Sequence, residues 1–218
     1  MTIFTQPWGY SKLETYEGCP QRFKYQFIDK IPQPGSAAME RGQKMHENIE
    51  SYLNGWLKEL LPECQSFKEA IDAMRAEKFR AEQAIGLDRG WAILPDWFGK
   101  QTWLRAKADA MYIKDGELVV VDFKSGKYRI PSTEQVELYA VVGGAMYPEV
   151  PLVRAEYWYL DTGEVYSKTY SQPELHALRK KFEKRVIPMY TDEKWEPQPS
   201  TGCRWCSYSK TKGGSCIY

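Results

Sequence analysis

The order of local sequence patterns predicts an α/β (α+β) fold, in which helices flank a central mixed β-sheet. Helix-type patterns come first, strand-type patterns follow, and then one helix, a second strand pair and a last helix complete the chain. The 218 residues are 43% hydrophobic and 27% charged, which is typical of a folded globular chain. We therefore expect a single domain over residues 1–218, with a helical part at 36–85.

Capping boxes indicate where four of the helices begin. Each pairs a serine with Glu or Gln three residues later, and this pair satisfies two free backbone N–H groups. The four serines are Ser11, Ser66, Ser132 and Ser171. We expect the last three helices to run to about Ala84, Tyr147 and Tyr190. A further helix without a clear cap is predicted over about 37–60, where apolar residues recur at helical spacing.

β-branched and alternating segments predict the strands of the sheet. The expected strands are 91–94, 102–113, 117–123, 152–160 and 164–170. Turn signals at Lys114-Asp-Gly116 and Asp161-Thr-Gly163 separate two neighbouring pairs, so we expect these pairs to be antiparallel hairpins.

The strongest local chemistry lies on two of these strands. Asp122 and Lys124 are two residues apart in VVVDFKSGK, so a strand would direct both side chains to one face. The turn at 114–116 would bring Asp109 beside Asp122. Two converging carboxylates suit Mg²⁺ or Mn²⁺, and a lysine beside them can stabilise charge on a phosphate or activate water. The same spacing recurs at Asp192-Glu-Lys194, where no strand precedes it and we expect only a solvated loop.

Two further motifs make the pattern more specific. Gly42-x3-His46 lies on the predicted helix upstream, and Gln135-x3-Tyr139 lies on one face of the helix that follows Lys124. The ordered set resembles the RecB-like branch of the PD-(D/E)xK nuclease superfamily, including CRISPR-associated and phage RecB-like exonucleases. This resemblance implies a restriction-endonuclease-like core with an N-terminal helical part and a C-terminal cysteine-rich segment.

The resemblance also implies roles for individual residues. His46, Asp109, Asp122 and the backbone carbonyl of Phe123 would hold Mg²⁺ or Mn²⁺, and Lys124 would help to generate the attacking hydroxide. Gln135 and Tyr139 would support the site and the DNA strand. The catalytic set is therefore Asp109, Asp122, Lys124, Gln135 and Tyr139. The sequence leaves open whether Glu50 or Glu82 also reaches the metal.

The chain has five cysteines, and three of them lie near one end. Two-residue spacing lets Cys203 and Cys206 reach one metal centre, with Cys216 as a third ligand. The resemblance adds Cys19 as the fourth, and implies that a [4Fe-4S] cluster ties a cysteine-rich tail at 195–218 to Cys19. Zinc and metal-free cysteines remain the alternatives. Cys64 has no partner by spacing, and we expect it to be buried.

The charge pattern bears on the substrate and the partners. The net charge of +1 is not that of a typical nucleic-acid binder, yet residues 99–130 hold seven basic residues against four acids. We therefore expect a divalent-metal-dependent deoxyribonuclease that hydrolyses phosphodiesters, as an exonuclease acting on single-stranded DNA or DNA ends. The alternative is a non-catalytic DNA-binding or assembly module that keeps the fold and the metal staple.

Other expectations concern location and assembly. No P-loop motif is present, so a separate helicase or recombination partner would supply any motor. No apolar run of about 18 residues exists and no secretory signal is apparent, so we expect no membrane span. An odd number of cysteines fits the reducing cytoplasm. Oligomerisation is left open.

Overall fold

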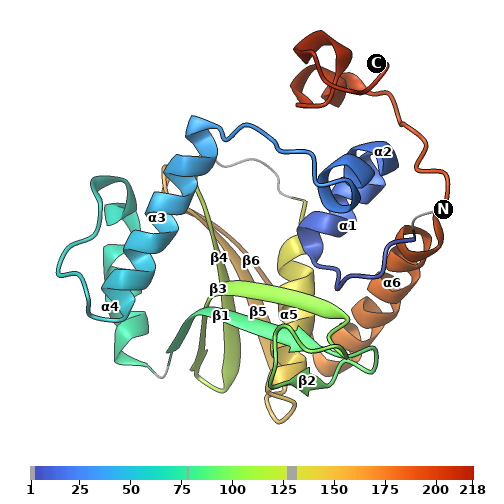
Figure 1. Ribbon diagram of the computed structural model, residues 1–218. Coiled ribbons are helices and arrows are strands. Elements are labelled where there is room, and N and C mark those ends of the chain that lie inside the picture. Colours follow the sequence, from blue (N-terminus) through green and yellow to red (C-terminus); the bar gives the residue numbers. More distant parts are fainter. Residues whose placement is uncertain (1–2, 78, 127–131) are drawn as a thin grey trace. The chain divides into compact units, whose positions relative to one another are not determined.

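The structure, a computed structural model, describes residues 3–77, 79–126 and 132–218. The chain divides into two compact units. The end unit combines residues 1–35 with 182–218, and the sheet unit spans 36–181. The sheet unit holds a mixed six-stranded sheet with helices beside it, which confirms the predicted α/β fold class (Figure 1). The expectation of one nuclease domain over 1–218 stays a prediction.

The sheet unit contains most of the regular structure. Its helices are α3 (Ala37–Leu53), α4 (Lys68–Ala76) and α5 (Glu134–Met146), and a 3₁₀ segment spans Pro62–Phe67. Its strands are β1 (Phe79–Leu87), β2 (Ile93–Leu94), β3 (Leu104–Lys114), β4 (Glu117–Lys124), β5 (Leu152–Tyr159) and β6 (Glu164–Ser171). The strand order is β2-β1-β3-β4-β5-β6. All neighbours are antiparallel except β4 and β5, which the α5 crossover connects in parallel.

The end unit is helical and irregular. It contains α1 (Tyr10–Gly18), α2 (Pro20–Phe23), a π-helical turn at Lys24–Ile28 and the C-terminal half of α6 (Gln172–Thr191). Short 3₁₀ turns follow at Thr201–Trp205 and Lys210–Lys212. Aromatic contacts form its core, among them the stacked rings of Phe23 and Trp195, whose centroids lie 5.6 Å apart.

Helices cover both faces of the sheet near β4. Val119 and Val121 share a core with residues of α3 and α4, including Met45 and Ile71. Leu118 and Val120 alternate with them along the strand and lie against α5 at Gly143. β4 is therefore buried on both sides, which explains its continuous apolar sequence.

The sheet forks between β3 and β4. Residues 110–114 of β3 pair with β4, whereas residues 104–109 pair only with β1. The last pair of the ladder is Ala110 with Val121. The two strands separate beyond this pair, where Asp109 is the next residue on β3 and Asp122 is the next residue on β4. The changed direction of β1 and β3 relative to β4 is visible in Figure 1.

One predicted helix was wrong over its second half. A helix was expected from Ser66 to about Ala84, but α4 ends at Ala76 and residues 79–87 form β1. The helical part predicted at 36–85 is therefore shorter at its C-terminal end. Local helix propensity predicted the longer helix, but pairing with β3 along the whole segment decides the structure. The capping box also failed here, because the Ser66 hydroxyl donates to the carbonyl of Leu160 instead (2.9 Å).

The remaining helix limits differ by smaller amounts. The helix predicted over 37–60 ends at Leu53, and Ser36 caps its start by accepting the N–H of Met39 (3.2 Å). Half of the box at Ser171 forms, since its N–H donates to Glu174 Oε2 (2.8 Å), while its hydroxyl donates to the same oxygen (2.6 Å). None of the described helices combines the length and the apolar character needed to cross a membrane.

Tight packing of α5 on β4 leads to a stability prediction. A Cβ at Gly143 would lie 2.8 Å from a methyl carbon of Leu118 and 3.1 Å from one of Val120. Gly143→Val should therefore lower the free energy of unfolding by about 1–3 kcal/mol through overpacking. Ala145→Val, at a half-buried position of the same helix, is the control for the change in helix propensity. A denaturant midpoint equal to that of the native protein would contradict this packing.

Candidate functional site

Asp109 satisfies the backbone at the fork of the sheet. Its side chain is 9% exposed, and its Oδ2 accepts a hydrogen bond from the N–H of Phe123 (2.7 Å). This N–H belongs to β4 beyond the last residue paired with β3, so the carboxylate takes the place of the missing backbone acceptor. The bond keeps Asp109 beside the end of β4.

His46 reaches the same place from α3. Its Nδ1 lies 3.2 Å from Asp109 Oδ1, and its Nε2 lies 2.8 Å from the carbonyl oxygen of Phe123. Both contacts are hydrogen bonds only when the two ring nitrogens carry protons. Burial lowers the pKa of His46, but the Asp109 carboxylate, with help from Asp122 and the Phe123 carbonyl, outweighs it and raises the pKa above its ordinary value.

Small and charged residues hold α3 close to this end of the sheet. Gly42 lies one turn before His46, and a Cβ on it would be 3.0 Å from the Ser125 hydroxyl oxygen. Arg41 donates twice to Asp161, at 2.6 and 3.1 Å, in the turn between β5 and β6. The Gly42-x3-His46 motif thus combines close backbone approach with a histidine on the same helix.

Asp122 and Lys124 project from the end of β4 as the spacing predicted. Asp122 is 3% exposed, and Lys124 Nζ lies 2.6 Å from its Oδ2. Apart from this ion pair, the buried Oδ2 has no hydrogen-bond partner among the described residues. Burial and the neighbouring Asp109 raise the pKa of Asp122 to about 7, although Lys124 and His46 act against the shift.

A hydrogen-bonded chain connects Lys124 to α5. Its ammonium donates to Gln135 Oε1 (2.7 Å), and Gln135 Nε2 donates to the Tyr139 hydroxyl (3.1 Å). The ammonium also lies 4.9 Å from the centroid of the Tyr157 ring. Burial keeps the pKa of Tyr139 well above its ordinary value, so the phenol stays protonated. The Gln135-x3-Tyr139 motif therefore orients the lysine.

Glu82 is the residue whose place the sequence left open. It lies opposite Asp109 in the register of β1 and β3, with a left-handed backbone (φ 49°). Glu82, His46 and Asp109 each offer a ligand atom within 4.8 Å of the other two. Positive φ is costly for glutamate and is found mostly at functional positions. The sequence named Glu82 only as one of two possible extra acids, because the segment reads as helix.

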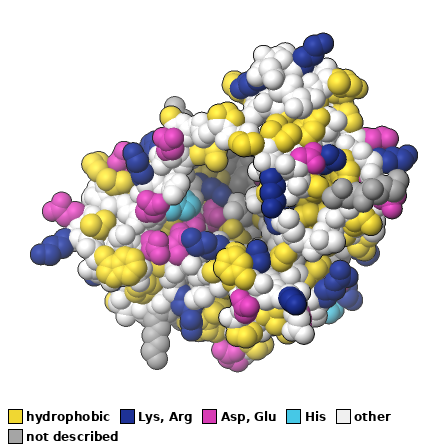
Figure 2. Space-filling model, viewed as in Figure 1, with side chains coloured by type: hydrophobic (Ala, Val, Ile, Leu, Met, Phe, Trp, Pro, Cys, Tyr) yellow, Lys and Arg dark blue, Asp and Glu magenta, His cyan; other side chains and the backbone are white. Residues whose placement is uncertain are grey.

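These residues line an open cleft of about 500 Å³. Glu50 lines it too but does not belong to the three-residue group, and Lys107 forms an ion pair with Glu82. Figure 2 shows acidic side chains gathered beside a histidine, with basic side chains next to them. The cleft thus combines carboxylates, an imidazole and an ammonium group.

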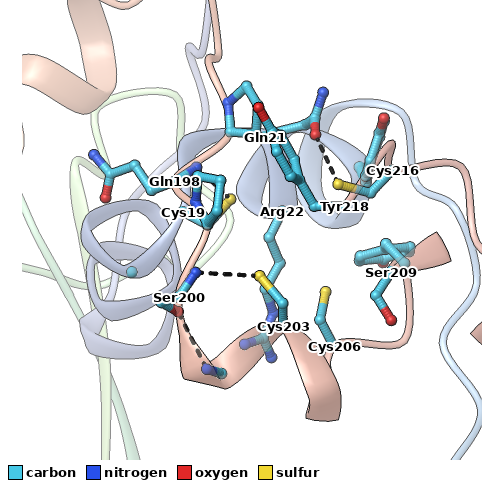
Figure 3. Close-up of a pocket in the computed structure, with 16 residues that line it drawn as sticks. Cys19, Gln21, Arg22, Gln198, Ser200, Cys203, Cys206, Ser209, Cys216 and Tyr218 are labelled. Carbon is cyan, nitrogen blue, oxygen red and sulfur yellow. Dashed lines mark hydrogen bonds between the residues drawn. The ribbon is translucent and has the colours of Figure 1, made fainter. Parts of the chain in front are cut away.

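Four of the five cysteines line one cavity of the end unit, with a volume of about 210 Å³. Cys19 lies between α1 and α2, and Cys203, Cys206 and Cys216 follow from the C-terminal segment (Figure 3). Backbone N–H groups of Gln198 and Ser200 donate to the sulfurs of Cys19 and Cys203, both at 3.4 Å.

The sulfur atoms are spread around this cavity. Among the described residues, no three cysteines bring their sulfurs within 4.8 Å of one another. All five cysteines are free, and Cys64 is buried in the sheet unit, where burial raises the pKa of its thiol to about 11. The expected burial of Cys64 is confirmed.

The raised pKa of His46 can be tested directly in metal-free protein. Asp109→Asn removes the negative charge beside the ring, so the pKa of His46 should fall below its native value. Proton NMR of the imidazole signals during a pH titration in EDTA measures it, because the chain has only two histidines. The signals of His176, which lies on α6 and does not line the cleft, are the internal control. An unaltered His46 curve would mean that the carboxylate does not face the ring.

Comparisons with known proteins agree with this site. Two solved structures share the fold at low identity. The protein SSO0001 is 14% identical with a TM-score of 0.52, and the match covers 100% of this chain and 89% of that one. A protein from Eubacterium rectale, named "Putative exonuclease", is 10% identical with a TM-score of 0.54, and the match covers 97% and 89%.

A comparison with curated proteins gave no match. The family model described as the PD-(D/E)XK nuclease superfamily matches residues 7–211, which include every residue of the cleft. The chain therefore belongs to the PD-(D/E)XK nuclease superfamily.

Proposed function

We propose that the protein is a divalent-metal-dependent DNA nuclease that hydrolyses phosphodiester bonds. The observation that carries the proposal is the convergence of His46, Asp109 and the Phe123 carbonyl at the fork of the sheet, with the Asp122–Lys124 ion pair at the end of β4. Lysine next to a pair of buried carboxylates suits phosphate chemistry better than a purely structural ion-pair network.

The donor set fits Mg²⁺ or Mn²⁺. Carboxylates, a carbonyl and an imidazole are ligands for hard or intermediate cations, and Asp122 Oδ2 is a buried acceptor without a hydrogen-bond partner among the described residues. His46, Asp109, Asp122 and the Phe123 carbonyl would hold the ion, and Glu82 is close enough to join them. When bound, the ion would supply Lewis-acid stabilisation of the phosphate and lower the pKa of water.

The residues of the chain would then position the reactants. The Lys124 ammonium would donate a hydrogen bond to the attacking water and stabilise the hydroxide that remains when the water proton passes to solvent, while Gln135 and Tyr139 keep the ammonium in place. The water oxygen forms a bond to phosphorus, the phosphorus–oxygen ester bond breaks, and the leaving oxygen takes up a proton. Asp109 holds the carbonyl of Phe123 in position through the adjacent N–H.

Action on single-stranded DNA or DNA ends, as an exonuclease, is the substrate class that we favour. The name of the Eubacterium rectale protein supports it, as does the open cleft. A separate helicase or recombination partner would supply any motor. The free cysteines suit a reducing cytoplasm. The second candidate, a non-catalytic DNA-binding or assembly module, would show binding without cleavage under every divalent metal.

We also propose a [4Fe-4S] cluster on Cys19, Cys203, Cys206 and Cys216. The shared cavity supports it, and so do the N–H donors aimed at two of the sulfurs, since hydrogen bonds to sulfur tune such clusters. A single zinc ion with bonds of about 2.3 Å would need sulfurs roughly 3.8 Å apart. Among the described residues, no three of the cysteine sulfurs lie that close together.

Loss of the lysine tests the nuclease. Lys124→Ala and Asp122→Asn should each lower the cleavage rate of labelled DNA in Mg²⁺ or Mn²⁺ by roughly 10²–10⁴-fold. Melting temperatures measured alongside check that the fold is intact. Lys194→Ala is the matched control, because Asp192-Glu-Lys194 repeats the spacing outside the cleft. Full activity of Lys124→Ala would refute the site, and DNA binding without cleavage by native protein would favour the second candidate.

Removing one thiolate tests the cluster. Anaerobically purified native protein should be brown and contain about four iron and four sulfide per chain, whereas Cys203→Ser should lose most of its visible absorption. Its melting temperature should fall by several degrees, since a bound centre stabilises the folded state. Cys64→Ala should keep the native iron content. A colourless native protein that contains one zinc ion per chain would contradict the cluster and identify zinc as the bound metal.

A further inference from the structure

We propose that Trp97, Phe98 and Arg105 form a base-stacking platform that guides a single DNA strand to Asp109. The inference rests on the proposed nuclease function and adds a binding subsite outside the cleft. Phe98 is 78% exposed, which is unusual for a large aromatic side chain that contacts no core. It lies in the loop between β2 and β3, within the sheet unit.

The loop is held rigid although its aromatic tip is exposed. Asp96 accepts the N–H of Phe98 on its Oδ1 (2.8 Å), and its carbonyl accepts the hydroxyl of the buried Thr102 (2.9 Å). Gly99 fits tightly here, since a Cβ would lie 3.2 Å from the same carbonyl oxygen. A loop backbone fixed in this way loses little conformational entropy when a ligand stacks on the Phe98 ring.

Arg105 joins the ring to the strand that carries Asp109. Its Nε donates to the Trp97 carbonyl (2.8 Å), and its guanidinium carbon lies 5.0 Å from the centroid of Phe98 and 5.6 Å from that of Trp97. Aromatic rings together with arginine are the usual means by which proteins bind unpaired bases and the phosphates between them.

A basic path leads from the platform to the cleft along β3. Arg105 and Lys107 alternate with the buried Ala106 and Ala108, so both point away from the core. Opposite Arg105 on β1 lies Gly86, which is buried beneath Asp96 and Thr102, and opposite Lys107 lies the exposed Ala84, which leaves the path open beside Lys107. Lys107 lines the cleft together with Asp109. Asp109 is four residues beyond Arg105 along β3, a distance of roughly 14 Å.

These features favour single-stranded over double-stranded DNA. In a duplex the base faces are stacked inside and an exposed ring cannot reach them, whereas an unpaired base presents its face freely. The basic groups described here are few and arranged in a line, which suits one backbone rather than two. Two further basic residues of the predicted excess, Lys127 and Arg129, lie outside the described residues.

Binding without cleavage provides the test. Fluorescence anisotropy of a labelled oligothymidylate in EDTA should show that Phe98→Ala binds roughly 5- to 100-fold more weakly than native protein. The loss should be much smaller for a duplex of equal length. Trp56→Ala is the matched control, because Trp56 is 73% exposed in the same unit but lies after α3. Melting temperatures should be unchanged in both variants.

Salt dependence separates stacking from charge. Phe98→Ala should leave the slope of log affinity against log salt unchanged, whereas Arg105→Gln should reduce its magnitude by about 0.7, the effect of one phosphate contact on a single strand. Native-like binding by Phe98→Ala would overturn the platform, and so would an equal loss of affinity in Trp56→Ala. In either case, DNA cleavage by the native protein would leave the nuclease proposal standing. Native protein that neither binds nor cleaves DNA would overturn both.

Discussion

The bond from the Phe123 N–H to the Asp109 carboxylate is the interaction on which the rest of the site depends. β3 and β4 separate at this point, and a buried N–H left without an acceptor would cost about 1–3 kcal/mol. Asp109 supplies that acceptor with one oxygen and faces His46 with the other. The two strands can therefore separate while the backbone keeps its hydrogen bond, next to the cleft that residues of α3, β1 and β3 line.

The same arrangement makes the site electrostatically unfavourable by itself. Two buried carboxylates lie close together, which raises the pKa of Asp122 to about 7, while His46 is driven towards its charged form. Glu82 adds a third acid on a strained backbone. A divalent cation would relieve all three conditions at once, because it replaces the proton on His46 and neutralises the carboxylates. Functional sites typically contain such residues with unfavourable charge or backbone conformation, which lower the stability of the folded protein.

The sequence predicted those parts of the molecule that depend on local spacing. Asp122 and Lys124 share a strand face, and Gln135 and Tyr139 share a helix face, so their relation needs no knowledge of the fold. Glu82 could not be found in this way, because its position depends on the pairing of β1 with β3, more than twenty residues away along the chain. The segment 79–87 carries helix-favouring residues, and only the nonlocal ladder makes it a strand.

The two donor sets differ in chemistry, and each lies within one compact unit. Oxygen and imidazole ligands gather at the fork of the sheet unit, whereas thiols surround a cavity in the end unit. Hard cations prefer donors of the first kind, whereas iron and zinc prefer thiolates. Cys19 and the three C-terminal cysteines are more than 180 residues apart along the chain. A centre that joins them closes a long loop, which restricts the unfolded chain and would stabilise the end unit, whose two segments come from opposite ends of the sequence.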